Sequence, residues 1–393
     1  MPDYHYLIVG GGIAADAAAR GIREVDTVRD VGVLAEEPDA PYNRPPLTKG
    51  LWKGDPLEGI WRGTADAGVV LHLGKKVAKI DPAAKTVTDT RGATYRYGRL
   101  LLATGVRPRR LVTGGEAVVY YRTLADYRRV REAADAHKRF LVIGGGFIGS
   151  ELAAALVAAG CKVTMAFPDP TIGARLFPAD LARFVSKYFE EKGVTVLAGQ
   201  SVLGVVKKGR AYVVRTLAGA DLDAHVVVAG IGAQPNVELA EAAGLPTENG
   251  IAVDDRLRAG HPDVFAAGDV ASFHSAALGE RVRVEHEDNA LAMGKYAGRA
   301  MAGADDGPYA HLPFFYSDLF DLGYEAVGDL DPRLKTVSDW KVPFREGVVY
   351  YLDQGRVRGV LLWNTWNQVD AARRLLAEKG PFTEANVKGR LPE

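Results

Sequence analysis

A glycine-rich turn near the start of the chain constrains its fold more than any other feature. The turn Gly10–Gly12 follows the apolar run Tyr4–Val9 and precedes the alanine-rich stretch Ile13–Glu24, which has good helix propensity. A β-branched run, Val31–Leu34, comes next and ends at Glu36. Strand, glycine turn, helix and strand in this order predict a βαβ unit with parallel strands.

The same order recurs in the middle of the chain. The turn Gly144–Gly146 follows the apolar run Phe140–Ile143, and the stretches Phe147–Ala159 and Lys162–Phe167 read as the next helix and strand. Each unit is followed by alternating segments that resemble a set of hairpins and close on a proline. Two similar modules in tandem explain this repetition better than coincidence.

The predicted fold class is therefore α/β, with two Rossmann-like dinucleotide-binding domains. Each domain is expected to be a parallel sheet that carries a small antiparallel meander, and the meanders close on Pro108 and Pro235. From about position 311 onward, aromatic residues and short strands precede a charged helix, Gln368–Lys379. This change in pattern predicts a C-terminal α+β domain.

The spacing of the glycines indicates what the two turns bind. In such turns the first glycine permits a tight bend, the second lets the backbone approach a pyrophosphate, and the third position must be small. The helix N-terminus then offers free N–H groups to the phosphates. The positions that match are Gly10, Gly12 and Ala15 in the first module and Gly144, Gly146 and Gly149 in the second.

An acid about 20 residues further on should bind a ribose hydroxyl of the nucleotide. Glu36 and Asp169 occupy these places. Asp169 favours NADH over NADPH, because its carboxylate would repel a 2′-phosphate. Arg175 leaves NADPH as the alternative nucleotide, since its guanidinium could tolerate a phosphate or stack on adenine. Alternatively, Arg175 forms only a surface salt bridge.

Charge and composition exclude several classes of function. Lys plus Arg and Asp plus Glu number 49 each, so the formal net charge is zero and no nucleic-acid partner is predicted. Apolar residues make up 47% of the chain, which excludes disorder over most of its length. No segment reaches the ~18 apolar residues of a membrane span. The first strand starts within a few residues of Met1, so we expect no signal peptide and a cytoplasmic protein.

Several longer segments resemble those of the FAD-dependent pyridine nucleotide oxidoreductases, in particular the ferredoxin-reductase and apoptosis-inducing-factor branch. They are PYNRPPLTKGLW (41–52), FLVIGGGFIGSELAAAL (140–156), VFAAGDVASF (264–273), RVRVEHEDNALAMGKYAG (281–298) and FFYSDLFDLGYEAVG (314–328). The resemblance implies a three-layer fold like that of glutathione reductase. A split FAD domain (1–113 and 236–310) would enclose an NAD(H)-binding domain (114–235) and precede the C-terminal α+β domain (311–393).

The resemblance also implies a set of FAD contacts. Within this set, Glu36 would bind the adenosine ribose, Arg44 and Lys49 would approach the pyrophosphate and the isoalloxazine, and Asp269 would bind the ribityl chain. His286 and Tyr316 would lie beside the flavin ring. The remaining cofactor-binding positions implied outside the second glycine turn are Gly10, Gly12, Ala15, Ala103, Thr104, Gly105, Arg109, Gly232, Gly268 and Glu285.

Four residues are predicted to take part in the chemistry: Phe147, Glu151, Lys49 and His286. Phe147 follows the second turn directly, at the nicotinamide site that the resemblance implies; the alternative is a core aromatic that packs the helix on its sheet. Glu151 lies on the same helix face, and a charge in so apolar a helix needs a partner. Lys49 is the predicted partner, and the alternative is an ordinary solvent-screened ion pair.

His286 is expected to begin a helix whose N-terminus stabilises the negative charge of a reduced flavin. A metal site formed by Glu285, His286, Glu287 and Asp288 is disfavoured, because four consecutive residues of one helix cannot converge on an ion. A solvated acidic capping turn is the other alternative. No metal site is predicted anywhere in the sequence.

The chain has a single cysteine, Cys161, so an intrachain redox disulfide is impossible. Electrons from NADH should therefore leave the flavin directly for an external acceptor. The resemblance favours a ferredoxin-type iron–sulfur carrier. A dehydrogenase that uses quinone, cytochrome or oxygen, and a slow redox-sensing flavoprotein, are the alternatives. A homodimer is also left open.

Overall fold

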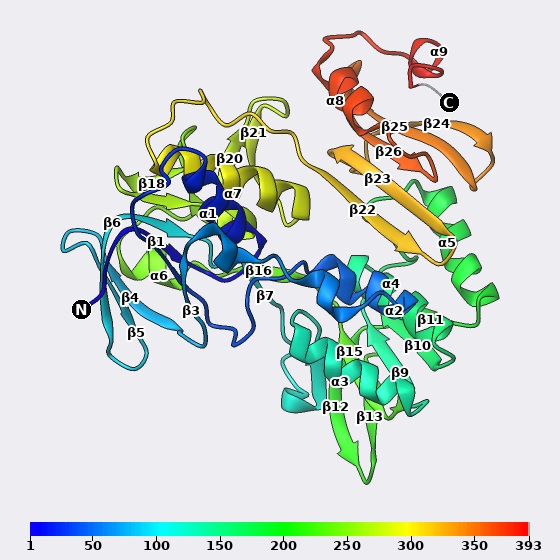
Figure 1. Ribbon diagram of the computed structural model, residues 1–393. Coiled ribbons are helices and arrows are strands. Elements are labelled where there is room, and N and C mark those ends of the chain that lie inside the picture. The colour runs from blue at the N-terminus through cyan, green and yellow to red at the C-terminus, as the bar shows by residue number, and fades with distance from the viewer. Residues whose placement is uncertain (392–393) are drawn as a thin grey trace. The chain divides into compact units, whose positions relative to one another are not determined.

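The computed structural model describes residues 1–391 and divides into two compact units (Figure 1). Unit 1 comprises Met1–Asn43, Glu58–Arg107 and Gln234–Phe314. Unit 2 comprises Arg44–Leu57, Pro108–Ala233 and Phe315–Glu393. The finer division into FAD, NAD(H) and C-terminal domains stays a prediction.

Unit 1 is built on an eight-stranded sheet with the order β18-β19-β6-β1-β2-β3, to which β4 and β5 are attached. Its strands are β1 (Asp3–Val9), β2 (Val31–Leu34), β3 (Val70–His72), β4 (Val77–Asp81), β5 (Thr86–Asp89), β6 (Thr94–Leu102), β18 (Arg258–His261) and β19 (Val264–Ala266). The central strand β1 pairs in parallel with both β2 and β6. Parallel strands covered on both faces read as continuous apolar runs, which is why the glycine turn follows such a run.

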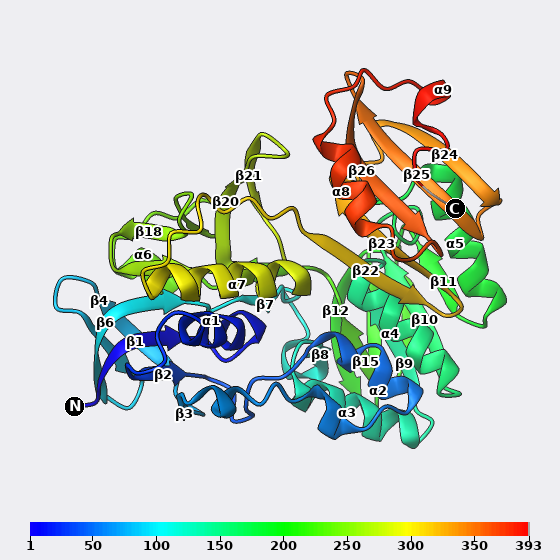
Figure 2. The same ribbon diagram turned by 45° about the horizontal axis from the view of Figure 1, so that its top comes forward.

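Two helices, α1 (Ile13–Arg23) and α7 (Glu287–Met301), lie side by side in unit 1 (Figure 2). Small residues permit this close approach. A Cβ placed on Gly294 would lie 2.4 Å from the carbonyl oxygen of Ala14, and one on Gly298 would lie 2.0 Å from that of Ala18. The alanine-rich character of α1 thus serves helix packing as well as helix propensity.

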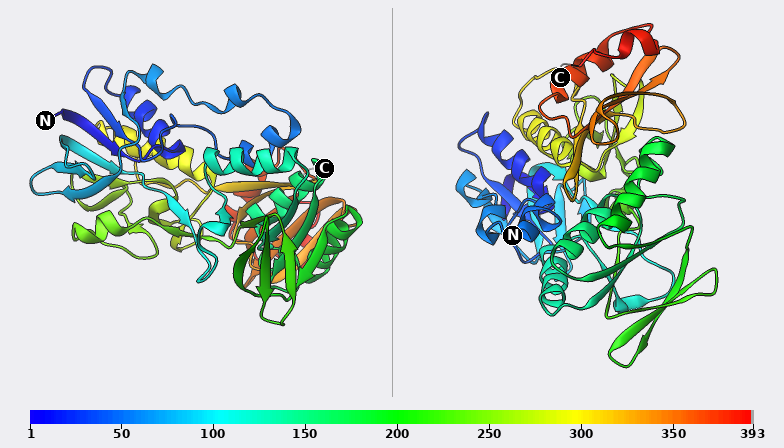
Figure 3. Two further views of the ribbon diagram at one scale, coloured as in Figure 1. Left: turned by 90° about the horizontal axis from the view of Figure 1, so that it is seen from below. Right: turned by 90° about the vertical axis from the view of Figure 1, so that its right-hand side faces the viewer.

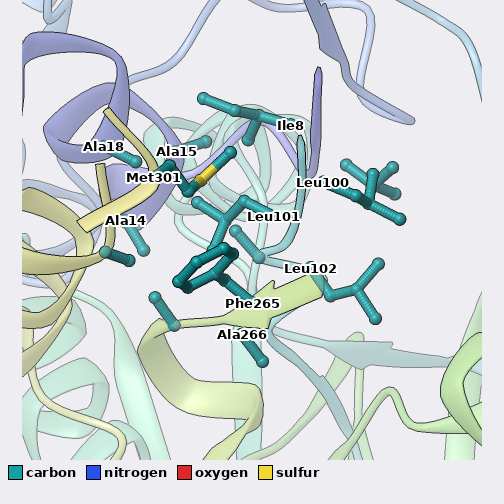
Figure 4. Close-up of a cluster of buried hydrophobic side chains, with 14 of the residues drawn as sticks. Ile8, Ala14, Ala15, Ala18, Leu100, Leu101, Leu102, Phe265, Ala266 and Met301 are labelled. Atoms are coloured by element: carbon teal, nitrogen blue, oxygen red, sulfur yellow. The ribbon is translucent and has the colours of Figure 1, made fainter. Parts of the chain in front are cut away.

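The core of unit 1 lies between these helices and the sheet. In Figure 4 the buried side chains of Leu101, Phe265 and Met301 gather beside Ala15 and Ile8. Unit 1 also contains a three-stranded sheet and short helical segments, one of which begins at Leu57, a residue of unit 2. They are β17 (Ile251–Ala252), β20 (Ala271–Ser275), β21 (Glu280–Arg283), α6 (Glu238–Ala242), η2 (Leu57–Ile60), η3 (Thr64–Ala67) and η5 (Gly268–Val270).

Unit 2 contains a five-stranded parallel sheet with the order β11-β10-β9-β15-β8. Its strands are β8 (Val118–Tyr120), β9 (Arg139–Ile143), β10 (Lys162–Phe167), β11 (Thr195–Ala198) and β15 (Val226–Ala229), and its helices are α3 (Leu124–Asp135), α4 (Phe147–Ala158) and α5 (Ala179–Glu191). The order around the central strand repeats that of unit 1, as expected for two similar modules.

The two predicted meanders are built differently. In unit 1, β4 and β5 lead into β6, which is itself a strand of the parallel sheet. In unit 2 the meander is a separate sheet of β12 (Val202–Lys208), β13 (Ala211–Thr216) and β14 (Asp221–Ala224). The hairpin of β12 and β13, drawn in green, projects from the rest of this unit (Figure 3).

The C-terminal part of unit 2 is a five-stranded sheet with the order β22-β23-β26-β25-β24. Its elements are β22 (Phe314–Leu319), β23 (Leu322–Gly328), β24 (Lys335–Val342), β25 (Glu346–Asp353), β26 (Arg356–Trp363), α8 (Val369–Ala377) and α9 (Glu384–Val387). The predicted α+β character is confirmed, and α8 lies within the predicted helix Gln368–Lys379.

An arm comprising residues 44–57 belongs to unit 2, although the sequence on both sides of it belongs to unit 1. It contains η1 (Pro45–Leu47) and α2 (Gly50–Lys53). Trp52 donates from Nε1 to the carbonyl oxygen of Leu47 at 2.7 Å and packs edge-on against Tyr127 of α3. The chain pattern alone did not predict this location of the arm.

None of the helices within residues 1–391 is long and apolar enough to cross a membrane.

Candidate active site

The first glycine turn has the shape that a dinucleotide phosphate group requires. Gly10 has a φ of +131°, and a Cβ there would lie 2.1 Å from the carbonyl oxygen of Ala103. Gly12, the N-cap of α1, would place a Cβ in open space with nothing within 4 Å. Ala15 is fully buried. The turn is thus closed against the sheet and open before the helix N-terminus, so it fits a pyrophosphate.

The second glycine turn repeats this construction in unit 2. Gly144 has a φ of +114°, and its Cβ would lie 2.2 Å from the carbonyl oxygen of Gly230. A Cβ on Gly149 would lie 2.1 Å from the carbonyl oxygen of Gly144, so the third position packs the helix on the strand. Gly146, the N-cap of α4, again faces open space. One chain therefore carries two separate cradles for dinucleotide phosphates.

The two predicted ribose acids lie just after the second strand of each module. The Glu36 carboxylate pairs with Lys76 at 2.8 Å, and both side chains are largely exposed. Asp169 pairs with Arg175 at 3.2 Å, with the arginine side chain 80% exposed. The salt bridge considered for Arg175 is thus present in the structure. Both acids keep access to solvent and hence to a ribose.

The other predicted flavin-site residues of unit 1 lie at the ends of its strands and at a helix start. Thr104, just after β6, donates from Oγ1 to the carbonyl oxygen of Asn236 at 2.9 Å, and the next residue, Gly105, has a φ of +64°. Gly268 and Asp269 form η5 directly after β19. Parallel strands present such residues at one edge of a sheet.

His286 is the N-cap of α7, as the sequence predicts for the residue that begins this helix. Burial lowers the pKa of His286 to about 4, against the opposing effect of the Asp269 and Asp288 carboxylates. The imidazole is therefore neutral at pH 7 and carries one N–H donor. Glu285 pairs with Arg283 at 2.6 Å. Within residues 1–391, no group of three or more His, Cys, Asp or Glu is placed to hold a metal ion.

Asp16 is a buried acid of unit 1 that the sequence reasoning missed. Its carboxylate accepts hydrogen bonds from Arg62 Nε and Thr64 Oγ1, each at 2.7 Å, and Arg62 also donates to Asn43 Oδ1. The side chain fixes a distant loop to α1, whose N-terminus forms the first cradle. A charge within an alanine-rich helix was the available signal, because such a charge needs a partner.

The predicted pair of Lys49 and Glu151 forms within unit 2. Lys49 Nζ lies 2.6 Å from Glu151 Oε1, and the two side chains are only 13% and 4% exposed. The pair is therefore largely shielded from solvent, unlike the screened surface pair considered as the alternative. Lys49 Nζ also lies 5.0 Å from the centre of the Tyr316 ring, in cation–π geometry.

Two hydroxyl groups complete the hydrogen bonding of the Glu151 carboxylate. Thr48 Oγ1 donates to Oε2 and Ser317 Oγ donates to Oε1, both at 2.6 Å. Thr48 comes from the arm and Ser317 from β22, and both are buried. Neither residue was predicted, because an isolated Ser or Thr carries no sequence signal of its own.

Phe147 is half-buried in the first turn of α4 and contacts the C-terminal sheet. Its ring lies 5.4 Å from that of Phe315 in an edge-to-face arrangement and 6.5 Å from that of Tyr324. Burial raises the pKa of Tyr324 well above its usual value, and the Glu151 charge adds to this effect, so the phenol is neutral. Phe147, Phe315 and Tyr324 thus form an apolar cluster beside the buried ion pair.

The predicted site residues thus fall into two groups, one in each unit. Unit 2 also holds Arg44, whose guanidinium donates to the carbonyl oxygen of Arg122 at 3.1 Å, and Arg109, whose Nε donates to that of Ala233 at 3.1 Å. The backbone N–H of Arg109 donates to the carbonyl oxygen of Gly232, which has a φ of +95°.

Two dinucleotide-binding folds in one chain, each with a glycine cradle before a helix, define an oxidoreductase that binds two nucleotides. Residues 4–294 match the family described as pyridine nucleotide-disulphide oxidoreductase, and residues 341–378 match that described as apoptosis-inducing factor, mitochondrion-associated, C-term. The chain belongs to the pyridine nucleotide-disulphide oxidoreductase family.

Three comparisons place the chain within this family. Apoptosis-inducing factor 1, mitochondrial, of Dictyostelium discoideum is 34% identical over 98% of this chain and 80% of its own length. The ferredoxin–NAD(+) reductase component of the anthranilate 1,2-dioxygenase system of Burkholderia cepacia is 35% identical over 95% and 94%. A solved structure of a covalent putidaredoxin reductase–putidaredoxin complex matches with a TM-score of 0.89 and 30% identity, over 96% of this chain and 94% of that one.

The protein is therefore a FAD-dependent NADH oxidoreductase that uses FAD and NAD(H). The two cradles fit this assignment, because each leaves open space at a helix N-terminus where a side chain would otherwise block a pyrophosphate. The family name refers to a disulfide, but this chain has one cysteine. Cys161 is buried, and burial raises the pKa of its thiol.

Proposed function

We propose that this enzyme passes electrons from NADH through FAD to a ferredoxin-type iron–sulfur protein. The observation that carries the proposal is the nearly full-length similarity to a ferredoxin–NAD(+) reductase component. A solved reductase bound covalently to its redoxin also matches the chain over most of its length. The single buried cysteine supports the proposal, because a thiol relay needs a second cysteine.

Bound FAD would supply the chemistry that links a two-electron donor to a one-electron acceptor. The chain's own residues would hold the reactants. We assign the FAD pyrophosphate to the turn Gly10–Gly12 and the NADH pyrophosphate to Gly144–Gly146, each at a helix N-terminus. In unit 1, neutral His286 would donate a hydrogen bond from the N-terminus of α7, whose partial positive charge favours negative charge nearby.

In unit 2, Phe147 would orient the nicotinamide by stacking and exclude water from it. Lys49 would provide a fixed positive charge, held in place by its ion pair with Glu151 and its cation–π contact with the Tyr316 ring. A buried, paired ammonium reorganises little during a reaction, which is how fixed charges lower a barrier.

The acceptor is tested by anaerobic rapid mixing with NADH followed by reoxidation with one candidate at a time. The candidates are a [2Fe–2S] ferredoxin, a quinone, cytochrome c and oxygen. We expect kcat/KM for the ferredoxin to exceed that for every other acceptor by at least about tenfold, near 1.4 kcal/mol. Slow flavin reduction with a long-lived long-wavelength absorbance band would instead indicate a redox sensor.

A second candidate function is an NADH dehydrogenase of the apoptosis-inducing-factor type, which uses quinone, cytochrome or oxygen. Residues 341–378 favour it, because they match the C-terminal family of apoptosis-inducing factor, and so does the relative from Dictyostelium discoideum. The reoxidation experiment separates the two candidates, since this one requires the fastest turnover with a quinone, cytochrome or oxygen.

Nucleotide choice is expected to depend on Asp169. Replacing Asp169 by Ala removes the carboxylate that would repel a 2′-phosphate, and it releases Arg175 from its salt bridge. We expect the ratio of NADH to NADPH in kcat/KM to fall about tenfold, near 1.4 kcal/mol. Steady-state kinetics with both nucleotides checks this. An unchanged ratio would assign the choice of nucleotide to Arg175 or to the backbone.

Electron exit is expected to be independent of Cys161. Replacing Cys161 by Ser should leave both flavin reduction and acceptor reduction within about twofold of the original rates, apart from a small packing cost to stability. Single-turnover traces with NADH and then with ferredoxin check both steps. Normal flavin reduction with lost acceptor reduction would contradict direct exit from the flavin.

A further inference from the structure

Strand β22 contacts helix α4 through two pairs of residues that have matching spacing. Phe315 and Ser317 share one face of the strand, and Phe147 and Glu151 share one face of the helix. Phe315 contacts Phe147, and Ser317 donates to Glu151. Two residues along a strand span about 6.6 Å and four residues along a helix span about 6 Å, so the two contacts match in spacing.

The Glu151 carboxylate is held by three donors from two parts of unit 2, the arm and strand β22. The arm supplies both Lys49 to Oε1 and Thr48 to Oε2, and β22 supplies Ser317 to Oε1. All three distances are 2.6 Å, which is short for a hydrogen bond and typical of bonds to a charged acceptor. The two hydroxyl donors are neutral. They therefore orient the carboxylate, while Lys49 balances its negative charge.

We infer that Ser317 and Thr48 are positioning residues for hydride transfer, which act through Glu151 on the placement of Lys49. Ser317 belongs to the C-terminal sheet, outside both glycine cradles, so this sheet takes part in preparing the nicotinamide site. The inference rests on the roles proposed above for Phe147 and Lys49. It is independent of which acceptor finally takes the electrons.

If either hydroxyl is lost, the Glu151 carboxylate is no longer held in one orientation. Without Ser317 Oγ, the buried Glu151 carboxylate keeps Lys49 and Thr48 but can rotate, and Lys49 follows it. Phe147 keeps its contacts with Phe315. Nicotinamide binding should therefore stay intact while the rate of hydride transfer falls, because small misplacements of a fixed charge weaken its effect on the barrier.

The test is single-turnover flavin reduction by NADH in holoenzyme variants that separate shape from hydrogen bonding. We expect Ser317→Ala and Thr48→Val each to lower the limiting reduction rate about tenfold, with the NADH Kd within about twofold of the original. Ser317→Thr and Thr48→Ser keep a hydroxyl and should recover most of the rate. If Ser317→Thr does not fold, the Thr48 pair alone carries the comparison.

The decisive experiment combines each hydroxyl substitution with Glu151→Gln. Because both hydroxyls act through one carboxylate, Ser317→Ala and Thr48→Val should each add little once Glu151 is replaced. Ser338→Ala, at a half-buried serine on the opposite edge strand of the same sheet, is the matched control and should leave the rate unchanged.

Three outcomes would overturn the inference. These are additive losses in the Glu151→Gln background, a raised NADH Kd with an unchanged rate, and rate losses that only follow losses of FAD content and melting temperature. Phe147→Ala and Lys49→Met separate this failure from failure of the proposed site. If those two variants slow flavin reduction and the hydroxyl variants do not, only the role of Ser317 and Thr48 is wrong. If none slows it, the proposed site itself is wrong.

Discussion

Replacing Glu151 by Ala is expected to lower the free energy of unfolding by about 3–5 kcal/mol, the usual cost of removing one partner of a buried ion pair. The substitution leaves the Lys49 ammonium largely buried without its carboxylate and leaves two buried hydroxyls without their acceptor. The measurement is denaturant unfolding of the holoenzyme at saturating FAD, followed by far-UV circular dichroism. Flavin reduction by NADH should be lost in parallel.

An exposed ion pair of the same unit provides the matched control. Glu191 lies 3.8 Å from Lys187 on α5, and both side chains are more than half exposed. Replacing Glu191 by Ala should change the free energy of unfolding by about 0.5 kcal/mol or less, because solvent screens such pairs. Equal losses for Glu151→Ala and Glu191→Ala would contradict a special role for the buried pair.

Much of the fold follows from the sequence because its signals are local. A parallel strand buried on both faces is a short apolar run, and a phosphate turn needs glycines at fixed spacing. For this reason the predicted strand Lys162–Phe167 matches β10, and the predicted start of α4 at Phe147 is confirmed. The pairing of Lys49 with Glu151 was also predictable, because a charge in an apolar helix needs a partner.

The features that the sequence did not predict depend on contacts between distant segments. The arm 44–57 lies in sequence between two parts of unit 1, and its membership of unit 2 depends on contacts such as that of Trp52 with Tyr127. Ser317 is 166 positions from Glu151, and nothing in its own strand marks it as the donor to that carboxylate. Such hydroxyl donors can be identified only from a structure that shows which carboxylate they contact.

Replacing Gly146 by Ala is expected to abolish useful NADH binding while leaving the fold intact. Gly146 has a φ of −89°, which any residue adopts, and a Cβ there meets nothing within 4 Å. The added methyl would occupy the space through which the backbone approaches a pyrophosphate. We expect the NADH Kd to rise at least about 100-fold, near 2.7 kcal/mol, as measured by titration calorimetry. FAD content should stay near one per chain, because the turn that we assign to FAD, Gly10–Gly12, lies in unit 1.

The neighbouring glycine gives the opposite expectation and so tests the reasoning. A Cβ on Gly149 would lie 2.1 Å from the backbone oxygen of Gly144, so Gly149→Ala forces helix α4 away from strand β9. We expect loss of folded protein, seen as a low soluble yield and a lower melting temperature. If Gly146→Ala instead unfolded the protein, or bound NADH normally, Gly146 would not line a nucleotide cradle. Gly146 is the N-cap of α4 and Gly149 lies in the first turn of that helix, so the contrast tests what each added Cβ would meet.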